Sequence, residues 1–145
     1  MSMMPNPQYE AYIDGASHGN PGPAGIGVVL FHRPASGGVA AVPVRELSQP
    51  LGVTTNNVAE YMALIYALQE ALADGCANLT VRSDSELLVR QVSGQYAVRE
   101  ATLRLLHGLV RHLIGKFQHV IVEHVPRAHN GLADRLATRA AKRSL

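Results

Sequence analysis

The sequence predicts an α/β fold built on a five-stranded mixed sheet with helices on both faces. Two patterns carry this prediction. Residues 9–51 contain three strand-like segments separated by stretches rich in Gly, Pro and Asn, which is typical of an antiparallel meander. From residue 54 onward, helical and strand patterns alternate, so parallel strands are added to the meander through right-handed crossovers.

The predicted strands of the meander lie at residues 9–14, 26–31 and 42–51. The stretch 15–25 is predicted to form a loop or hairpin connection, and residues 34–40 are predicted to form a turn. Pro43 and Pro50 bracket the third strand. This favours an edge position, because proline cannot donate a hydrogen bond to a sheet ladder.

The rest of the chain is predicted to begin with a helix over 54–74, where apolar residues recur at helical spacing up to a C-terminal Gly75. A short strand at 79–82 then leads into a strand-to-helix switch at 83–92, which Gly94 ends. The remaining predicted elements are a helix at 100–116, a strand at 120–125 and a helix at 131–142.

A chain of 145 residues fits one domain, which we place at residues 8–145 after a disordered lead-in at residues 1–7. No apolar run reaches the roughly 18–20 residues of a membrane helix, and the N-terminal residues do not resemble a secretory signal. Cys76 is the only cysteine, which fits a reducing, cytoplasmic location. We expect a monomer with no membrane association and no obligate protein partner.

Charge is distributed unevenly along the chain. Residues 1–81 carry two basic and six acidic side chains, whereas residues 82–145 carry eleven basic and five acidic ones. A basic body around an acidic, metal-neutralised site would suit a polyphosphate backbone. Charge alone also fits a solvated, mildly basic surface.

Four acidic residues, Asp14, Glu60, Asp84 and Asp134, are the candidate catalytic residues and metal ligands. Asp14 and Asp84 end the first and fourth predicted strands, which become neighbours if the fourth strand is added in parallel beside the first. Two such carboxylates repel each other unless a cation lies between them. Mg²⁺ prefers oxygen ligands, and two ions could activate a water and stabilise the leaving oxygen of a phosphodiester.

Glu60 and Asp134 each have a second interpretation. Asn57 and Glu60 fit a capping box at the start of a helix. Asp134 falls in the first turn of the last predicted helix, where an acid stabilises the helix dipole. Taken singly, these structural roles are favoured, and only the set of four acids favours a metal site.

Four segments, in this order and spacing, resemble the motifs of the type 1 ribonuclease H family. They are residues 14–25, 54–60 (T-x-N-x-x-E), 83–85 and 130–134 (N-x-x-A/C-D), and the resemblance extends over about residues 9–140. It implies a ribonuclease H-like fold and endonucleolytic cleavage of the RNA strand of RNA·DNA hybrids with Mg²⁺ or Mn²⁺. The expected products end in 5′-phosphate and 3′-hydroxyl. It further implies that the four acids ligate metal and that Glu60 senses the RNA 2′-hydroxyl.

A hybrid is read by its shape, 2′-hydroxyls and phosphates, for which short polar side chains and backbone N–H groups are suited. Asn56 and Asn57 also fit a helix start, and Thr55 fits an ST-turn. The predicted substrate contacts are Gly15, Ser17, Asn20, Thr55, Asn56, Asn57, Ser85 and Asn130.

Two features depart from many family members. Some members carry a basic protrusion with Trp residues, whereas this chain has no Trp and only residues 94–99 at that place, so it resembles the short form. Arg104, His107 and Arg111 share a helix face that could hold substrate or could be plain solvated surface. His129 lies near the place of a mobile histidine that assists many members, and is either a catalytic residue or a surface histidine.

Two other functions are weighed against the hybrid-specific ribonuclease. A non-catalytic nucleic-acid-binding module is disfavoured because all four acids are present. A different nuclease of the same fold is disfavoured by the run at 54–60, although relaxed specificity that includes double-stranded RNA fits the short form.

Overall fold

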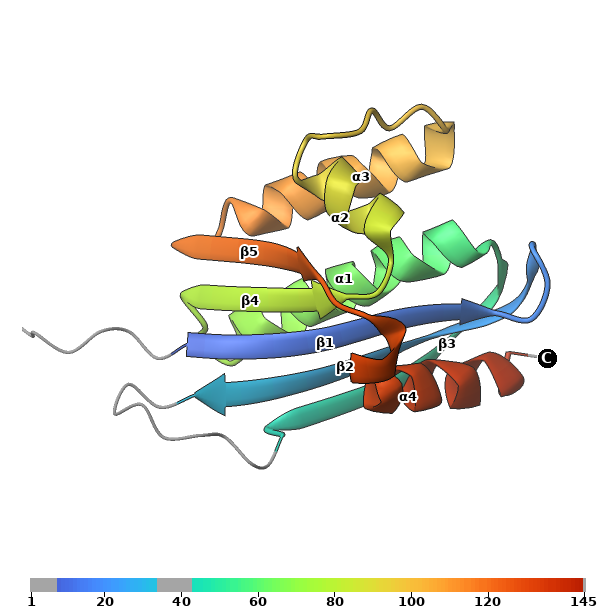
Figure 1. Ribbon diagram of the computed structural model, residues 1–145, viewed down its shortest axis with the longest axis horizontal. Helices are drawn as coiled ribbons and strands as arrows, with labels where there is room; N and C mark the ends of the chain where they lie inside the picture. The colour runs from blue at the N-terminus through green and yellow to red at the C-terminus, as the bar shows by residue number, and fades with distance from the viewer. Residues whose placement is uncertain (1–7, 34–42, 145) are drawn as a thin grey trace, which may run out of the picture.

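The computed structural model describes residues 8–33 and 43–144, so the predicted lead-in at 1–7 and the turn at 34–40 lie outside the described residues. Five strands form one sheet in the order β3-β2-β1-β4-β5 (Figure 1). β1, β2 and β3 are antiparallel neighbours, while β4 pairs in parallel with β1 and β5 with β4, which confirms the predicted mixed sheet. The strands are β1 (Gln8–Ser17), β2 (Gly22–Arg33), β3 (Arg45–Thr54), β4 (Asn78–Ser83) and β5 (His119–His124).

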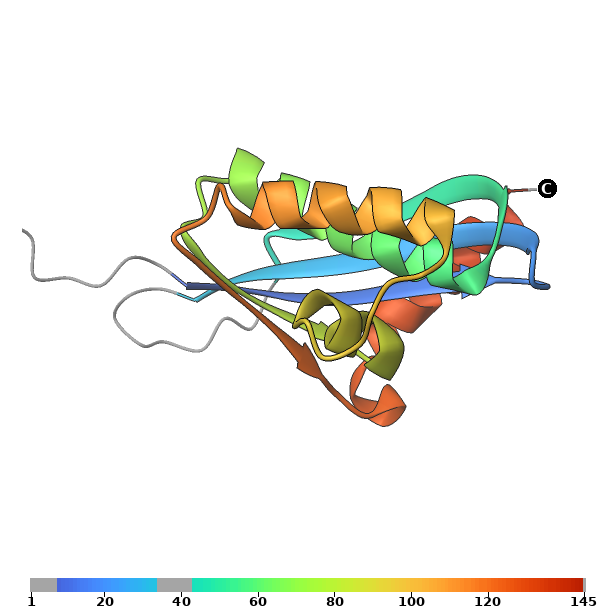
Figure 2. The same cartoon turned by 90° about the horizontal axis from the view of Figure 1, so that it is seen from above.

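Helices cover both faces of the sheet, as predicted (Figures 1 and 2). The helices are α1 (Asn56–Ala73), α2 (Glu86–Val92), α3 (Ala101–Ile114) and α4 (Gly131–Lys142), with the short 3-10 helix η1 (Arg127–His129) before α4. On one face α1 packs on β1 and β2 and is itself covered by α3, whereas α4 packs on β1, β2 and β3 from the other face. Within the described ranges, no helix is both long and apolar enough to cross a membrane.

The main core lies between the sheet and α1. Ala11 and Ile13 of β1 alternate with outward-facing residues and meet Leu64 and Leu68 of α1, and all four are fully buried. Each large aliphatic side chain buried in this way contributes roughly 1.5–3 kcal/mol to folding. The core therefore fixes α1 against the strand that carries Asp14.

The hairpin between β1 and β2 is longer than the sequence predicted. Ser17 pairs with Ala24, so only residues 18–21 form the turn, and Asp14 lies inside β1 rather than at its end. Gly25 belongs to β2, where it pairs with Ala16, and it is a glycine because a Cβ there would lie 2.5 Å from the Ala140 side chain. The glycine-rich composition thus reflects close helix packing as well as a turn.

The third strand is at the sheet edge, as its prolines predicted. It runs further than expected, to Thr54, because Pro50 is accommodated opposite Gly25 where the register shifts. An edge strand tolerates proline since one side of its backbone needs no ladder hydrogen bond. This extension carries the chain directly to the start of α1.

Candidate active site

Asp14 and Asp84 are brought together by the parallel pairing of β1 and β4. The paired register ends at Ile13 and Ser83, and Asp14 and Asp84 directly follow these two residues. One carboxylate oxygen from each of Asp14, Asp84 and Glu60 lies within 4.8 Å of the other two. Asp14 thus occupies the predicted place relative to β4, although β1 itself continues past it.

Glu60 reaches the same point from α1. The N-cap of α1 is Thr55, whose Oγ1 accepts a hydrogen bond from the Val58 N–H at 3.2 Å. Glu60 therefore lies beyond the position that would close a capping box with Asn57, and that structural interpretation is wrong. Its side chain is buried at the sheet instead of solvated at the helix start.

Gly15 allows α1 to approach β1 closely enough for this meeting of acids. A Cβ at Gly15 would lie 2.3 Å from the Ala59 carbonyl carbon, so the strand and helix backbones are in direct contact. The Gly15 N–H donates to Glu60 Oε1 at 3.2 Å. Gly15 is buried, and its contacts in the structure are to α1; the substrate contact remains a prediction.

Asp134 approaches from the opposite face of the sheet. Gly27, the cross-strand partner of Asp14, accommodates α4, because a Cβ there would lie 2.2 Å from the Ala133 carbonyl oxygen. The Asp134 carboxyl is close enough to contribute to the raised pKa of Asp14, although Asp134 lies outside the three-acid group. Asp134 is also in the first turn of α4, so its position serves the helix and borders the acids at once.

The acidic group is electrostatically unfavourable without a cation. Asp14 and Glu60 are each only 4% exposed. Burial raises the pKa of Asp14 above its ordinary value, and the negative charges of Glu60 and Asp84 raise it further. Burial also raises the pKa of Glu60, although hydrogen bonds from Asp14 and the Gly15 N–H oppose the shift. Protons or a cation must therefore compensate this charge.

The same group has the donor set of a divalent-cation site. Its ligand atoms are carboxylate oxygens, which Mg²⁺ and Mn²⁺ prefer over softer donors. Among the described residues, Glu60 Oε2 is buried without a hydrogen-bond partner. A buried acceptor of this kind is costly unless something binds it. The residues present therefore fit a bound divalent cation.

Asn130 connects this group to the end of η1. Its Nδ2 donates to the Ile13 carbonyl at 2.8 Å and to Asp84 Oδ2 at 3.4 Å, and the residue is 2% exposed. Both contacts hold parts of the acidic site in place. A direct substrate contact by Asn130, as the sequence predicted, would have to use its other amide atom, Oδ1, which has no partner within the described ranges.

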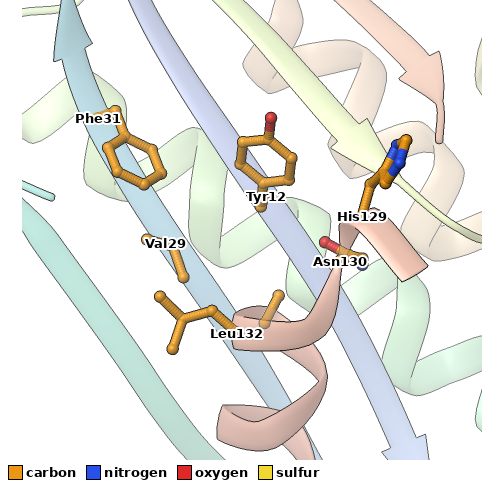
Figure 3. Close-up of a pocket in the computed structure, with 7 residues that line it drawn as sticks. Tyr12, Val29, Phe31, His129, Asn130 and Leu132 are labelled. Carbon is orange, nitrogen blue, oxygen red and sulfur yellow. The ribbon is translucent and has the colours of Figure 1, made fainter. Parts of the chain in front are cut away.

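His129 lies at the rim of a hollow beside the acids rather than among them. The hollow measures about 260 Å³ and is lined by residues of β1, β2 and the start of α4 (Figure 3). Tyr12 projects from the same face of β1 as Asp14, because side chains alternate along a strand. The lining residues are Tyr12, Val29, Phe31, His129, Asn130, Leu132 and Ala133. The catalytic role of His129 remains a prediction.

Polar residues form an edge next to the acids. Asn20 Oδ1, from the β1–β2 turn, accepts a hydrogen bond from the Asn56 N–H at 3.1 Å, which ties the turn to the start of α1. Ser17 Oγ donates to the Thr54 carbonyl at 3.0 Å in the same region. Asn20, Asn56 and Asn57 are exposed, so their side chains face solvent where a ligand could pass.

Two further residues near the site have distinct roles. Ser85, a predicted substrate contact, is the N-cap of α2 and accepts a hydrogen bond from the Leu88 N–H at 3.2 Å. Arg127 was not predicted as a site residue, yet it lies near enough to the acids for its positive charge to oppose the rise in the pKa of Glu60. The signal available in the sequence was a basic residue two positions before His129 and three before the fourth motif.

Fold and site together define a nuclease-like centre of carboxylates at the junction of β1, β4 and α1. Known proteins resemble this chain over most of its length. A family model described as "Reverse transcriptase-like" matches residues 12–140. Ribonuclease HI of Halobacterium salinarum is 42% identical over 130 residues, covering 90% of this chain and 62% of that protein. The "Bifunctional protein Rv2228c" of Mycobacterium tuberculosis is 42% identical over 127 residues, covering 88% of this chain.

Solved structures agree with these relationships. The N-terminal ribonuclease H domain of the mycobacterial protein superposes with a TM-score of 0.88 at 38% identity, covering 96% of each chain. LC11-RNase H1 in complex with an RNA/DNA hybrid superposes with a TM-score of 0.83 at 38% identity, covering 94% of this chain and 98% of that one. This chain belongs to the type 1 ribonuclease H family. It spans 34% of the length of the mycobacterial relative.

Proposed function

We propose that this chain is an endoribonuclease that hydrolyses the RNA strand of RNA·DNA hybrids and leaves 5′-phosphate and 3′-hydroxyl ends. The observation that carries the proposal is the convergence of Asp14, Glu60 and Asp84 within 4.8 Å from three separate elements. Two of these acids are buried. Such a group is unfavourable for stability alone, which points to a function that requires a cation.

The acids would hold Mg²⁺ or Mn²⁺, with two ions expected when substrate is bound. Bound divalent cations lower the pKa of a coordinated water and neutralise charge developing on a phosphoryl group. The chain's own contribution is orientation. Gly15 donates to Glu60 Oε1, and Asn130 Nδ2 donates to Asp84, so the carboxylates are positioned before substrate arrives.

Substrate recognition is proposed to use the exposed polar edge at Asn20, Asn56 and Asn57. These short side chains suit contacts to phosphates and 2′-hydroxyls, which select a duplex by shape rather than by base sequence. The LC11 relative, at 38% identity, is known in complex with an RNA/DNA hybrid, which supports this choice of substrate. Arg127, near the acids, is suited to meet a phosphate.

The test compares four labelled substrates of one sequence: hybrid, double-stranded RNA, double-stranded DNA and single-stranded RNA, of roughly 16–20 nucleotides. Each is incubated with Mg²⁺, with Mn²⁺ and with EDTA. We expect endonucleolytic cleavage of the RNA strand of the hybrid, abolished by EDTA. End-group analysis should find 5′-phosphate and 3′-hydroxyl termini.

Each contrary result has a distinct meaning. Binding without cleavage of any substrate would support a nucleic-acid-binding module instead. Cleavage of double-stranded RNA at a rate comparable to the hybrid would indicate relaxed specificity. Cleavage that persists in EDTA would overturn the metal requirement.

A further inference from the structure

A basic groove lies between α2 and α3, away from the acidic group. It measures about 510 Å³ and is lined by the end of α2, the connection after it and one face of α3. Arg104, His107 and Arg111 of α3 lie on this face at helical spacing, and none of the lining residues is acidic. The lining residues are Gln91, Gly94, Tyr96, Ala97, Val98, Arg104, His107, Gly108 and Arg111.

The groove is preformed by hydrogen bonds within the chain. The N–H groups of Gln95 and Tyr96 both donate to the Arg90 carbonyl, at 2.8 and 3.1 Å, which folds the connection back onto α2. The Arg90 guanidinium lies over the Tyr96 ring, 5.3 Å from its centroid. His107 Nε2 donates to the Gln91 carbonyl at 3.2 Å and so joins the two walls. A ligand would therefore meet a groove that needs little reorganisation.

The positive charge of the groove is not neutralised from within. Arg104 and Arg111 are exposed, and neither has an ion-pair partner among the described residues. The two nearby acids in the sequence are already engaged. Glu86 accepts from Arg90 at 2.8 Å, and Glu100 caps α3 by accepting from the Thr102 and Leu103 N–H groups.

α2 connects the acidic group to the groove along the chain. α2 begins two residues after Asp84, and Gln91 near its end lines the groove, so the helix rises about 8 Å between them. That is about two nucleotide steps of a duplex strand. The N-terminal ends of α1 and α3 also lie at the same end of the molecule (Figures 1 and 2). A duplex strand that leaves the acids in the direction of α2 would reach the groove.

We propose that this groove binds the phosphodiester backbone of the duplex whose other part occupies the acidic site, with Arg104 and Arg111 contacting phosphates. The proposal rests on the proposed function for the identity of the duplex. Charge complementarity carries it, because two unpaired guanidiniums beside an acid-free hollow suit a polyanion. Tyr96, 48% exposed, forms one wall of the same hollow.

Gly108 provides a sharp test. A Cβ there meets nothing within 4 Å, so a side chain can leave the helix at this position without steric overlap at its first atom. Gly108→Glu adds a negative charge to the groove, and Gly108→Gln adds nearly the same volume without charge. The double variant Arg104→Gln/Arg111→Gln removes the two charges. Lys116→Gln, beyond the end of α3, removes one charge outside the groove and is the matched control.

Binding is measured by fluorescence anisotropy against salt concentration, in the Asp14→Asn background with Mg²⁺, using hybrid, double-stranded RNA and double-stranded DNA. We expect the double variant and Gly108→Glu to weaken hybrid binding about 5- to 20-fold and to reduce the salt slope by about 1–2. Gly108→Gln and Lys116→Gln should bind like the parent. Circular dichroism melts of each variant check that the fold is kept.

Unchanged affinity and salt slope in both groove variants overturn the groove, whatever the chain cleaves. An equal loss in Lys116→Gln also overturns it, since the effect would then be general charge. If the groove variants behave as expected but the wild-type chain cleaves no hybrid, the proposed function fails and the groove stands.

Discussion

Glu10 and Asp14 lie on the same strand, four residues apart, and face the same side of the sheet, but their surroundings carry opposite charge. Glu10 forms ion pairs with Arg33 and Arg82, and Arg82 also contacts Glu123 at 3.4 Å. Asp14 meets Glu60 and Asp84 instead. The first arrangement is self-compensating, whereas the second needs a proton or a cation.

The comparison shows how one strand can carry both a structural and a functional acid. Strand alternation alone places Glu10, Tyr12 and Asp14 on one face. Arg82, which pairs with Glu10, lies over the Tyr12 ring at 5.6 Å from its centroid. Its positive charge therefore compensates Glu10 in the first half of β1 and not Asp14. Beyond that point β4 turns into α2, and the neighbours of β1 become acidic.

The largest expected effect is on catalysis. Asp14→Asn should reduce metal-dependent cleavage of the hybrid by roughly 10³-fold or more, because several kcal/mol of transition-state stabilisation depend on the bound cation. Glu10→Gln should retain activity within about threefold, since its partners are arginines away from the acids. Initial rates on the labelled hybrid measure both. Full activity of Asp14→Asn would show that Asp14 is not required for catalysis.

A second variant tests whether close packing brings the acids together. Gly15→Ala should destabilise the protein by about 1–3 kcal/mol, because the added methyl overlaps the α1 backbone. It should also lower activity, since Glu60 can no longer keep its contact with the Gly15 N–H. Urea denaturation and hybrid cleavage are the measurements. Gly108→Ala, at an exposed position of α3 with no neighbour within 4 Å, is a control for an added methyl without steric overlap.

The smallest expected effect concerns stability and pH in the metal-free protein. Folding raises the pKa of Asp14, so the folded state favours its protonated form. Its contribution to stability is full below the unfolded pKa, about 3.8, and is lost as pH rises towards the folded value. Asp14→Asn, which carries no charge, should therefore be more stable than wild type by about 0.5–2 kcal/mol at about pH 7 in EDTA.

The same experiment has internal controls. The difference between Asp14→Asn and wild type should disappear at about pH 3, where Asp14 is protonated in both folded and unfolded states. Mg²⁺ should raise the melting temperature of wild type but not that of the variant, because ligand binding to the folded state stabilises it. Equal pH profiles of the two proteins would show that the acids do not repel.

Local patterns predicted the elements better than their ends. Apolar spacing identified α1, and prolines identified β3 as an edge strand. The length of the β1–β2 hairpin was predicted too short, because a glycine at position 25 is typical of a turn and its close packing against α4 is visible only in the structure. Glu60 was ambiguous for a similar reason. A capping box and a site acid share one spacing, and only the start of α1 at Asn56 separates them.

The sequence by itself determined the identity and order of the four acids, the polar run before Glu60 and the absence of a Trp-bearing protrusion. These are properties of residue type and spacing, which do not depend on contacts. Tertiary structure alone decided that Asp14, Glu60 and Asp84 converge while Asp134 borders them, that Asn130 is buried, and that Arg127 lies near the acids. The reason is that these distances arise from strand register and from backbones meeting at Gly15 and Gly27, between segments far apart in the chain.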